Sequence, residues 1–539
     1  MTADTKINES NFAEVDQKVV DLPLPSLVPK AHHLALKSLF RQYDIRGIVS
    51  QELDYHEVDL SQLQWSEQVT LTPALAYALG CAYAAELLER LELDLKDLSS
   101  QSIKVVVGYD ARLSGPVLSQ ALELGLRRMG LDVLRLGLVP TPVVYFSTYE
   151  FKADKKESLQ IYGGLMVTGS HNPSAWNGFK LSFGCDSVYG EMLQKLYQRI
   201  TTANYQINHQ DLDLRVSSSY KLDLSTIYLN ALHSRLRFAQ PNLSHLKVVI
   251  DAGHGASGPL ALRFFESLGV QLKALYCDPD GHFPAHHPDP TVESNLTELK
   301  MAVREWDADV GLGFDGDGDR LGVVDREGQV IWGDQLLLLF AQAILKEQPQ
   351  AMIIGEVKCS QILYDGITEA GGIAEMWKVG HSLIKARMKE AKAPLAGEMS
   401  GHLFFADRFY GFDDALYAAA RLIERLSEKE FSLVAWRKSL PNMINTPELR
   451  VYCADQDKQA VITRFANAFA QNYTLSTIDG VRVQFAQGWG LVRASNTQPV
   501  LVMRFEANSE EWLSEYRTLV ESWLAQHAPE VRFDIDPNH

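Results

Sequence analysis

One pattern recurs along this chain: a short run rich in Val and Ile, then a turn containing Gly or Asp, then a stretch with the apolar spacing of a helix. Three such runs with their turns are 104–110 (KVVVGYD), 247–253 (KVVIDAG) and 351–357 (AMIIGEV). Short apolar strands that alternate with helices are typical of buried parallel or mixed sheets. The pattern therefore predicts three similar α/β domains within the 539 residues.

The two ends of the chain depart from this pattern. Residues 1–37 are polar, acidic and interrupted by Pro, which indicates a tail or surface arm. After about Asn442 the composition is that of a compact α+β segment. Two polar stretches, 51–70 and 201–225, are expected to be surface insertions.

The bulk composition excludes several classes of partner. A net charge of −17 argues against nucleic acid and anionic membranes, which both favour clustered Lys and Arg. The five cysteines lie far apart and form no CxxC pair, as expected for reduced thiols. Residues 1–17 show neither the basic region nor the apolar region of a signal peptide, and the longest apolar stretches, 73–88 and 336–345, are shorter than the roughly 18 residues of a spanning helix. We therefore expect a soluble, cytoplasmic protein.

The segment 168–173 (TGSHNP) offers a hydroxyl on a tight loop. It follows the apolar run 165–167, which we interpret as a strand end, and ligands of open α/β sheets gather at such ends. Gly169 permits close backbone approach and Pro173 stiffens the exit. The alternative is an ordinary turn in which Asn172 or Ser174 caps a helix.

A second run, 315–320 (DGDGDR), carries three carboxylates at alternating positions followed by a cation. Such hard oxygen ligands suit Mg²⁺, and three close carboxylates repel one another without a cation. An EF-hand needs Gly at the sixth position and Glu at the twelfth, where this chain has Arg320 and Arg326. A phosphorylated serine needs a cation and an arginine nearby, so this run and Ser170 together indicate phosphoryl transfer. A solvated acidic turn is the alternative.

Two further loops could bind a sugar phosphate. The segment 397–402 (GEMSGH) combines an acceptor, a hydroxyl and a titratable ring between glycines, although a plain Gly-rich turn is the simpler interpretation. The segment 493–499 (RASNTQP) combines a guanidinium with hydroxyls and an amide, the donors that a phosphate dianion requires.

A GxGxxG pattern competes with this interpretation. Residues 253–258 (GHGASG) follow an apolar run, and Asp278 lies about 20 residues beyond, as in a dinucleotide-binding fingerprint. However, Asp251 and His254 lie at the turn, and a dehydrogenase would leave the other loops unexplained.

With these loops in order, the chain resembles the α-D-phosphohexomutase superfamily, specifically its bacterial phosphomannomutase/phosphoglucomutase members. The resemblance runs from about Phe40 almost to the C-terminus and includes 40–47 (FRQYDIRG), 377–382 (WKVGHS) and 397–402. It implies four domains around a central cleft, the first three of similar α/β topology with mixed sheets and the fourth a smaller α+β domain. The implied bounds are 1–37 for the tail, 38–222 for the phosphoserine domain, 223–329 for the metal-binding domain, 330–441 for the sugar-recognition domain and 442–539 for the phosphate-binding domain.

The resemblance also implies a role for each loop. Ser170 would be the phosphorylated serine, and Asp315, Asp317 and Asp319 would bind one Mg²⁺ together with the phosphoserine. Glu398 and Ser400 would contact sugar hydroxyls that glucose and mannose present alike. The remaining implied site residues are Lys180, Arg46 and His402 as acid–base candidates; Tyr43, Arg320, Lys358 and His381 lining the site; and Arg493, Ser495, Asn496 and Thr497 gripping the second phosphate.

The implied reaction interconverts hexose 1-phosphate and hexose 6-phosphate of glucose or mannose. Phospho-Ser170 gives its phosphoryl group to one end of the sugar, the resulting 1,6-bisphosphate reorients, and Ser170 takes back the other phosphate. Glucose 1,6-bisphosphate or mannose 1,6-bisphosphate would be the activator. Met399, where relatives acting on glucosamine phosphate tend to carry Gln, favours unmodified hexoses. A monomer is expected.

Two other functions stay open at this level. One is a nicotinamide-type oxidoreductase that uses the 253–258 turn. The other is a non-catalytic sugar-phosphate sensor on the same fold, since fold alone does not establish activity.

Overall fold

The structure is a computed structural model that describes residues 13–14, 22–49, 71–92, 102–153, 159–206, 217–240, 242–495 and 498–533. The chain divides into two compact units. The first comprises Met1–Ile331 and His402–Leu433, and the second comprises Trp332–Gly401 and Val434–His539. Residues 402–433, which the sequence predicts in the third domain, belong to the first unit.

The first unit contains a mixed sheet in the order β1-β8-β4-β3-β5-β6-β2, with β7 paired to β6. Strands β8, β4, β3 and β5 are parallel, whereas β6 and β2 are antiparallel to their neighbours. The strands are β1 (Ala13–Glu14), β2 (Ile45–Ile48), β3 (Lys104–Tyr109), β4 (Asp132–Leu138), β5 (Gly163–Val167), β6 (Trp176–Phe183), β7 (Asp186–Ser187) and β8 (Ser219–Lys221).

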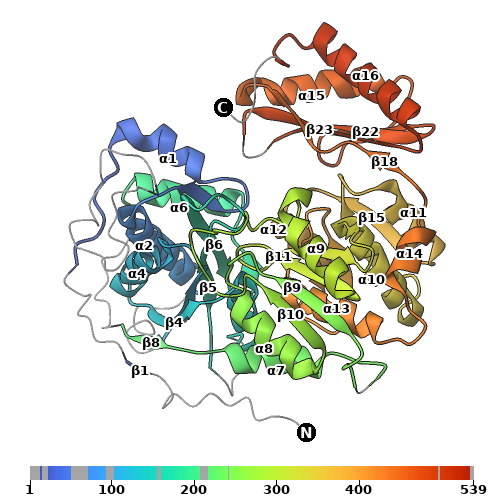
Figure 1. The fold of residues 1–539 in the computed structure, drawn as a ribbon. Helices are drawn as coiled ribbons and strands as arrows, with labels where there is room; N and C mark the ends of the chain where they lie inside the picture. The colour runs from blue at the N-terminus through green and yellow to red at the C-terminus, as the bar shows by residue number, and fades with distance from the viewer. Residues whose placement is uncertain are drawn as a thin grey trace. The chain divides into compact units, whose positions relative to one another are not determined.

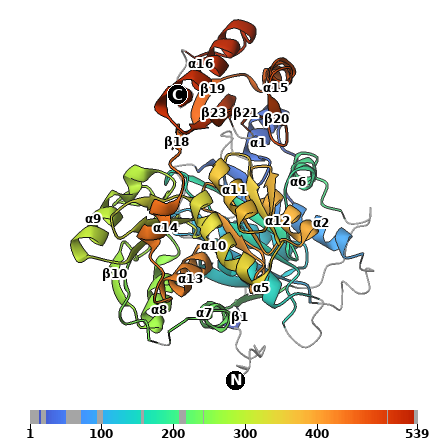
Figure 2. The ribbon, with the colours of Figure 1, turned by 90° about the vertical axis from the view of Figure 1, so that its right-hand side faces the viewer.

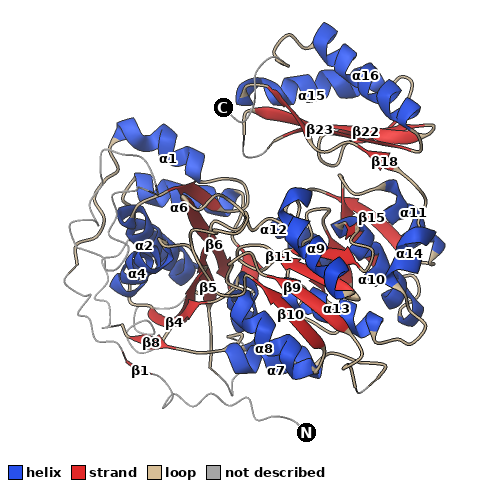
Figure 3. Cartoon of the chain, in the orientation of Figure 1, coloured by secondary structure: helices blue, strands red, loops and turns tan. Residues whose placement is uncertain are grey.

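Helices flank this sheet (Figure 3). They are α1 (His33–Leu39), α2 (Pro73–Arg90), α4 (Gly115–Arg128), α5 (Thr141–Glu150) and α6 (Glu191–Thr201). Helix α2 begins at a capped end, where Thr72 accepts a hydrogen bond from the Leu75 amide at 3.3 Å and Pro73 occupies the first helical position. It is buried along most of its length and packs on α4.

The second sheet of this unit has the order β10-β9-β11-β12-β13. Strands β10, β9 and β11 are parallel, and β12 and β13 are antiparallel. Its elements are α7 (Ser225–Ser234), β9 (Lys247–Asp251), α8 (Gly258–Leu268), β10 (Gln271–Leu275), α9 (Thr297–Trp306), β11 (Val310–Phe314), β12 (Leu321–Asp325) and β13 (Val330–Ile331), with short 3-10 turns at Lys30–His32 and Glu293–Leu296 elsewhere in the unit. The order repeats that of β4-β3-β5-β6, which confirms that the first two domains share a topology.

The segment 402–433 belongs to the first unit because aromatic side chains join it to α5 and α7. It contains β17 (Leu403–Phe405) and α13 (Ala415–Leu426). The Tyr410 ring lies edge-on to Phe146 with centroids 5.8 Å apart. The Tyr228 hydroxyl donates to Asp414, at 2.9 Å from Oδ2. These contacts anchor His402, just before β17, in the same body as Ser170.

The second unit contains three strands of the third sheet and the whole of the last sheet. Parallel strands lie in the order β15-β14-β16, again with the first strand in the middle, and helix α10 packs beside α11 (Figure 2). The elements are α10 (Gly333–Glu347), β14 (Met352–Glu356), α11 (Gln361–Glu369), β15 (Ile373–Trp377), α12 (His381–Ala391) and β16 (Leu395–Gly397), with α14 (Leu433–Ser439) beginning at the unit boundary.

The last sheet is antiparallel, in the order β18-β23-β22-β21-β20 with β19 paired to β23, and two helices pack on it (Figure 1). Its elements are β18 (Ile444–Asn445), β19 (Leu449–Tyr452), α15 (Asp455–Phe469), β20 (Thr474–Ser476), β21 (Val481–Phe485), β22 (Gly488–Ala494), β23 (Val500–Ala507) and α16 (Glu510–His527). The predicted smaller α+β domain is confirmed.

The sequence predicts three polar surface segments, at 1–37, 51–70 and 201–225. From Leu22 onward the predicted tail is anchored to the core: Val28 and Leu36 are buried in the hydrophobic cluster of the first sheet. Residues 219–221, expected within a surface insertion, instead form β8 beside β4, where Ser219 is buried. The whole of the predicted insertion at 51–70 and the stretch 207–216 lie outside the described residues. In the described part of the chain, no helix is both long and apolar enough to cross a lipid bilayer.

Candidate active site

Ser170 lies on the loop that joins β5 to β6, buried and in a left-handed backbone conformation with φ of +50°. The loop is held by a chain of hydrogen bonds. The Ser170 amide donates to Thr168 Oγ1 at 2.7 Å, and that hydroxyl donates to Asp110 Oδ2 at 2.7 Å. A non-glycine residue at this φ is strained and needs such support.

Arg112 holds the same loop from behind. Its guanidinium, fully buried and paired with Asp110 at 3.1 Å, donates to the Ser170 carbonyl at 2.8 Å. It also donates to the carbonyls of Asn172, Pro173 and Trp176 at 2.5–2.9 Å. A Cβ on Gly169 would lie 2.5 Å from Arg112 Cζ, so only glycine permits this approach.

The predicted acid–base candidate Arg46 reaches the loop from β2. Its Nη1 donates to the Gly169 carbonyl at 3.2 Å and to Asn172 Oδ1, while its Nε pairs with Asp44 at 2.6 Å. The loop is therefore fixed by guanidinium groups on two sides. Tyr43, another predicted site residue, lies two positions before β2.

The carboxylate run forms the tight turn between β11 and β12. Asp315 Oδ1 accepts hydrogen bonds from the amides of Asp319 and Arg320 at 3.0 and 3.1 Å. The Ser170 hydroxyl donates to Asp315 Oδ2 at 3.2 Å. The two loops, 145 residues apart in the chain and from different sheets, therefore meet as the sequence predicted.

Lys180 lies against the other two carboxylates. Its Nζ pairs with Asp317 Oδ2 at 2.7 Å and with Asp319 Oδ2, and the Thr141 hydroxyl donates to Asp317 Oδ2 at 2.6 Å. Burial disfavours the ammonium, but the two carboxylates hold the pKa of Lys180 above its ordinary value. Lys180 therefore stays protonated at neutral pH.

The donor set fits a hard divalent cation. Asp315, Asp317 and Asp319 are fully buried, with one oxygen of each within 4.8 Å of the others. Burial, followed by the charges of Asp317 and Asp319, raises the pKa of Asp315 well above its ordinary value. Within the described residues, Asp317 Oδ1 and Asp319 Oδ1 accept no hydrogen bond. Buried carboxylate oxygens left in this way are suited to bind Mg²⁺.

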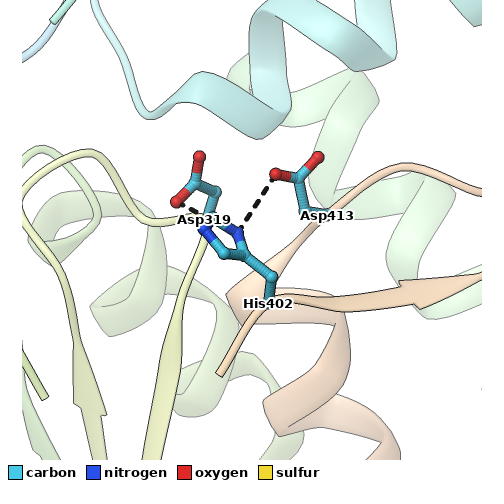
Figure 4. A group of neighbouring side chains, drawn as sticks. All are labelled: Asp319, His402 and Asp413. Atoms are coloured by element: carbon cyan, nitrogen blue, oxygen red, sulfur yellow. Dashed lines mark ion pairs between the residues drawn. The ribbon is translucent and has the colours of Figure 1, made fainter. Parts of the chain in front are cut away.

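His402 lies beside Asp319 and Asp413 (Figure 4). Its Nε2 accepts a hydrogen bond from Arg320 Nε at 3.0 Å, and its Nδ1 lies 3.2 Å from Asp413 Oδ2 and 3.5 Å from Asp319 Oδ1 (Figure 4). Ser170, the carboxylates, Lys180, Arg320 and His402 thus form one cluster in the first unit.

The predicted sugar-recognition loop is held in the second unit by the ends of neighbouring elements. Glu398 Oε1 accepts from the Gly380 amide at 2.6 Å, and the Ser400 hydroxyl donates to Glu398 Oε2 at 3.4 Å. Buried Glu356, at the end of β14, accepts from the Met399 amide at 3.4 Å. His381 begins α12 immediately after Gly380.

Lys358 and Arg493 lie in the same unit, and each pairs with a carboxylate. Lys358 Nζ donates to Glu448 at 2.8 Å and lowers the pKa of Glu448 to about 2. Arg493 donates to Asp479 at 3.1 Å. Ser495 follows β22, whereas Asn496 and Thr497 lie outside the described residues.

Sequence reasoning missed several residues that shape these sites: Asp110, Arg112, Thr141, His171, Glu356, Asp413 and Asp479. His171 Nδ1 lies 3.2 Å from Ser170 Oγ, and burial together with nearby Arg320 and Arg46 lowers the pKa of His171 well below its ordinary value. The Asp110–Arg112 pair could have been found, because it directly follows the predicted strand 104–109. The other residues give no local signal.

The 253–258 turn, the dinucleotide-type alternative, has a structural explanation. The Ala256 amide donates to the Gly316 carbonyl at 3.0 Å, so the turn supports the carboxylate loop. A Cβ on Gly258 would lie 2.0 Å from the Cys277 carbonyl oxygen. These glycines therefore serve close packing.

The comparisons with known proteins agree with this geometry. Four domain families match the chain in order: phosphoglucomutase/phosphomannomutase alpha/beta/alpha domain I at residues 37–206, domain II at 226–328, domain III at 332–443 and the C-terminal domain at 448–521. The chain belongs to the phosphoglucomutase/phosphomannomutase family.

Named relatives cover nearly the whole chain. A phosphomannomutase/phosphoglucomutase of Pseudomonas putida is 42% identical over 496 residues, which is 92% of this chain and 97% of the relative. A phosphoglucomutase of Neisseria meningitidis serogroup A is 38% identical over 493 residues, 90% of this chain and 97% of the relative. A solved structure of a phosphoglucomutase/phosphomannomutase family protein from Burkholderia thailandensis is 39% identical, with a TM-score of 0.79, and covers 92% of this chain and 99% of that one.

Membership of the phosphoglucomutase/phosphomannomutase family makes this chain an isomerase that works by phosphoryl transfer. Neither the oxidoreductase nor the sensor interpretation receives support from these relatives.

Proposed function

We propose that this phosphohexomutase uses Ser170 as its phosphoryl carrier and acts on the 1- and 6-phosphates of glucose and mannose. The observation that supports this most directly is the 3.2 Å contact of Ser170 Oγ with Asp315 Oδ2, beside two further buried carboxylates. A phosphoryl group on Ser170 would lie at these carboxylates, where a cation is needed to offset the charge.

Asp315, Asp317 and Asp319 are the proposed Mg²⁺ ligands, with an oxygen of phospho-Ser170. When bound, Mg²⁺ supplies positive charge that neutralises the transferring phosphoryl group. Arg46 and Arg112 keep the loop in place, so that the phosphoryl group is presented in one orientation. Arg320 is proposed to meet the substrate phosphate, because a guanidinium binds phosphate with two parallel hydrogen bonds.

Among the acid–base candidates, His402 is the proposed base. A guanidinium has only hydrogen-bond donors, and Lys180 stays protonated because Asp317 and Asp319 hold its proton. Of the three kinds of side chain, only an imidazole has a ring nitrogen whose lone pair can accept a proton. In the forward step the phosphorus–oxygen bond to Ser170 breaks, a bond to the sugar oxygen forms, and the hydroxyl proton passes to His402. Lys180 is the proposed donor to the departing serine oxygen.

The second unit is proposed to bind the sugar and the other phosphate. Glu398 and Ser400 would hydrogen-bond the sugar hydroxyls, with Met399 favouring unmodified hexoses. Further proposed contacts are Tyr43, Lys358, His381, Arg493, Ser495, Asn496 and Thr497. The proposed domains are those predicted above, at 38–222, 223–329, 330–441 and 442–539.

Three further properties belong to this proposal. The activator is a hexose 1,6-bisphosphate, of glucose or mannose, because each cycle passes through that compound. The protein acts as a monomer in the cytoplasm. Its small-molecule partners are hexose phosphates rather than nucleic acid or membranes, in line with the net charge of −17.

The first experiment is coupled turnover of glucose 1-phosphate and of mannose 1-phosphate, with Mg²⁺ and catalytic glucose 1,6-bisphosphate. Similar rates on both sugars are expected. In the same assay Ser170→Ala should lose turnover while calorimetry still detects substrate binding, and Ser174→Ala, on an exposed part of the same loop, should retain it. Full activity of Ser170→Ala would refute the phosphoserine.

A further inference from the structure

A buried lysine contacts the loop at 493–499 in the second unit. Lys458 lies in the first turn of α15 and is only 8% exposed. Its Nζ donates to the Ser495 carbonyl at 2.6 Å and to the Gln498 carbonyl at 2.9 Å. It also pairs with Asp455 Oδ1 at 2.6 Å. An ammonium has three hydrogens, so each of them has a partner, and two of the three partners are backbone oxygens of the loop.

The same loop is closed by hydrogen bonds of its own. The Ser495 amide donates to the Val500 carbonyl at 3.0 Å, and the Val500 amide donates to the Gln498 carbonyl at 2.8 Å. The Gln498 amide donates to the Ser495 hydroxyl at 3.2 Å. In the sequence, the two carbonyl groups that Lys458 binds flank residues 496–497 on either side. Lys458 therefore ties both ends of the loop to α15.

Packing alone does not explain a lysine at this position. Lysine is seldom buried, because removing an ammonium from water costs several kcal/mol. An apolar side chain of similar length would fill the same space without that cost. A buried lysine whose donors reach two carbonyl groups of one loop therefore indicates that the conformation of the loop matters.

The chemistry of phosphate gives a reason to fix these two carbonyl groups. An anion is repelled by carbonyl oxygens, which carry partial negative charge, and is attracted by hydrogen-bond donors. Oxygens that are bound to Lys458 cannot turn toward an anion at the loop. The loop can then offer a phosphate its donors, together with the guanidinium of Arg493 at the end of β22.

We propose that Lys458 is a positioning residue for the phosphate site at 493–499, where it holds the Ser495 and Gln498 carbonyl groups against α15. This inference rests on the proposed function, in which that loop binds the second phosphate of the substrate. Lys458 does not contact the phosphate in this arrangement. It acts through the backbone of the loop, so its loss should weaken substrate binding rather than the chemical step.

The main test uses Lys458→Met, which keeps most of the length of the side chain and removes its donors. We expect KM for glucose 1-phosphate to rise at least about 10-fold, with kcat changed less than about threefold. Lys458→Gln, which is too short to reach both carbonyl groups, should raise KM in the same way and serves if the Met variant fails to fold. A KM within threefold of wild type in either folded variant would overturn the inference.

Two further variants separate the loop contacts from the charge pair. Lys458→Arg keeps donors for both carbonyl groups, and its KM should stay within about threefold of the wild-type value. Asp455→Asn is the matched control: it removes the partner whose side chain is 77% exposed and leaves both contacts to the loop. Its KM should also stay within about threefold of wild type, as expected for an exposed ion pair. A KM of Lys458→Arg as high as that of Lys458→Met would contradict the role of the donors.

Hydrogen exchange gives a readout that general destabilisation would not reproduce. The amides of Ser495, Gln498 and Val500 are bonded within the loop, so their exchange reports its opening. In Lys458→Met, peptides that cover 493–500 should exchange at least about 10-fold faster, whereas peptides from α16 should exchange as in wild type. Unchanged exchange of the loop, or an equal increase throughout the second unit, would overturn the inference.

Arg493→Ala distinguishes failure of this inference from failure of the proposed phosphate site. Calorimetry with glucose 1-phosphate should show binding weakened at least about 10-fold in Arg493→Ala, because a guanidinium binds phosphate with charge-assisted hydrogen bonds. Wild-type affinity in that variant would refute the proposed phosphate site, and the inference with it. Weak binding by Arg493→Ala together with wild-type binding by Lys458→Met would refute the role of Lys458 alone.

Discussion

Ser170 is held in a strained conformation by Thr168, Asp110 and Arg112. Its φ of +50° is unusual for a residue with a Cβ. The Ser170 carbonyl oxygen accepts a hydrogen bond from the Arg112 guanidinium at 2.8 Å. The same guanidinium contacts three more carbonyls of the loop. Loop conformation and serine orientation therefore depend on one buried side chain.

Arg112→Lys should separate loop geometry from charge. Lysine keeps the cation but has no planar fork, so it cannot reach all four carbonyls. We expect kcat to fall about 10- to 100-fold, with a smaller change in KM. The variant should displace Ser170 but leave the residues that bind the substrate in place. Arg127→Lys, a change of another buried arginine of this unit, is the control. Equal kcat in the two variants would contradict the assigned role of Arg112.

The carboxylates make a second prediction at this scale. Asp317→Asn removes one charge from the triad while Thr141 can still donate to its oxygen. The Mg²⁺ concentration for half-maximal activity should rise at least about 10-fold, since a neutral amide is a weaker ligand for a hard cation. Asp307→Asn, an exposed carboxylate of the same unit, should leave the titration unchanged. An unaltered titration for Asp317→Asn would remove it from the ligand set.

At the level of elements, the candidate loops at 168–173, 315–320 and 397–402 lie at the ends of β5, β11 and β16. Strand β14 ends at buried Glu356, which accepts hydrogen bonds from the amides of Lys358 and Met399 at 2.6 and 3.4 Å. Glu356 therefore organises both the Lys358 turn and the loop at 397–402. Arg482, on β21, donates to the carbonyls of Val357 and Cys359 at 2.7 Å each, and links the same turn to the last sheet.

Glu356 should make the stability of the second unit depend on pH. Burial, opposed by Lys358 and reinforced by Glu398, raises the pKa of Glu356 from 4.5 to about 7. A carboxyl whose pKa is raised on folding favours the folded state below its unfolded pKa, and this contribution is lost as the pH rises through the folded pKa. The stability of the unit should therefore fall between pH 4.5 and about 7.

Glu356→Gln should remove that dependence. From pH 5 to pH 8, the wild type should lose more unfolding free energy than the variant does. The extra loss is expected to be on the order of 3 kcal/mol. Thermal unfolding at the two pH values measures it. Glu369→Gln, an exposed carboxyl of the same unit, is the control and should behave as wild type. Parallel pH profiles for wild type and Glu356→Gln would show that Glu356 does not titrate in this range.

At the scale of the whole molecule, the two compact units should unfold separately. Each has its own core, with one cluster centred on α2 and α4 and another on the last sheet. The proposed Mg²⁺ ligands all belong to the first unit, so a ligand that binds only its folded form should stabilise that unit alone.

Calorimetry tests this prediction directly. Two unfolding transitions are expected. Mg²⁺ should increase the unfolding free energy of the first unit alone, by about 2.7 kcal/mol at a concentration 100 times its Kd. The Glu356→Gln change should move the other transition. Asp317→Asn should abolish the Mg²⁺ shift without altering the second transition. A single transition, or an equal Mg²⁺ shift of both, would contradict this division.

Local residue patterns were enough to predict the α/β fold and the position of each loop. The strands at 104–109, 247–251 and 352–356 were predictable because buried parallel strands are continuous apolar runs. Ser170 and the 315–319 carboxylates were predictable because their chemistry is concentrated in a few adjacent residues. The resemblance to a family then assigned roles that local patterns left open.

Only the tertiary structure could reveal the partners that these residues acquire from distant parts of the chain. Nothing near Asp413 in the sequence points to His402, and Arg112 contacts the Ser170 loop from 58 residues away. Segment 219–221 becomes a sheet strand rather than a surface insertion because β4 offers it a parallel edge. Residue chemistry is local and therefore visible in the sequence, whereas charge pairing, burial and pKa depend on which elements pack together.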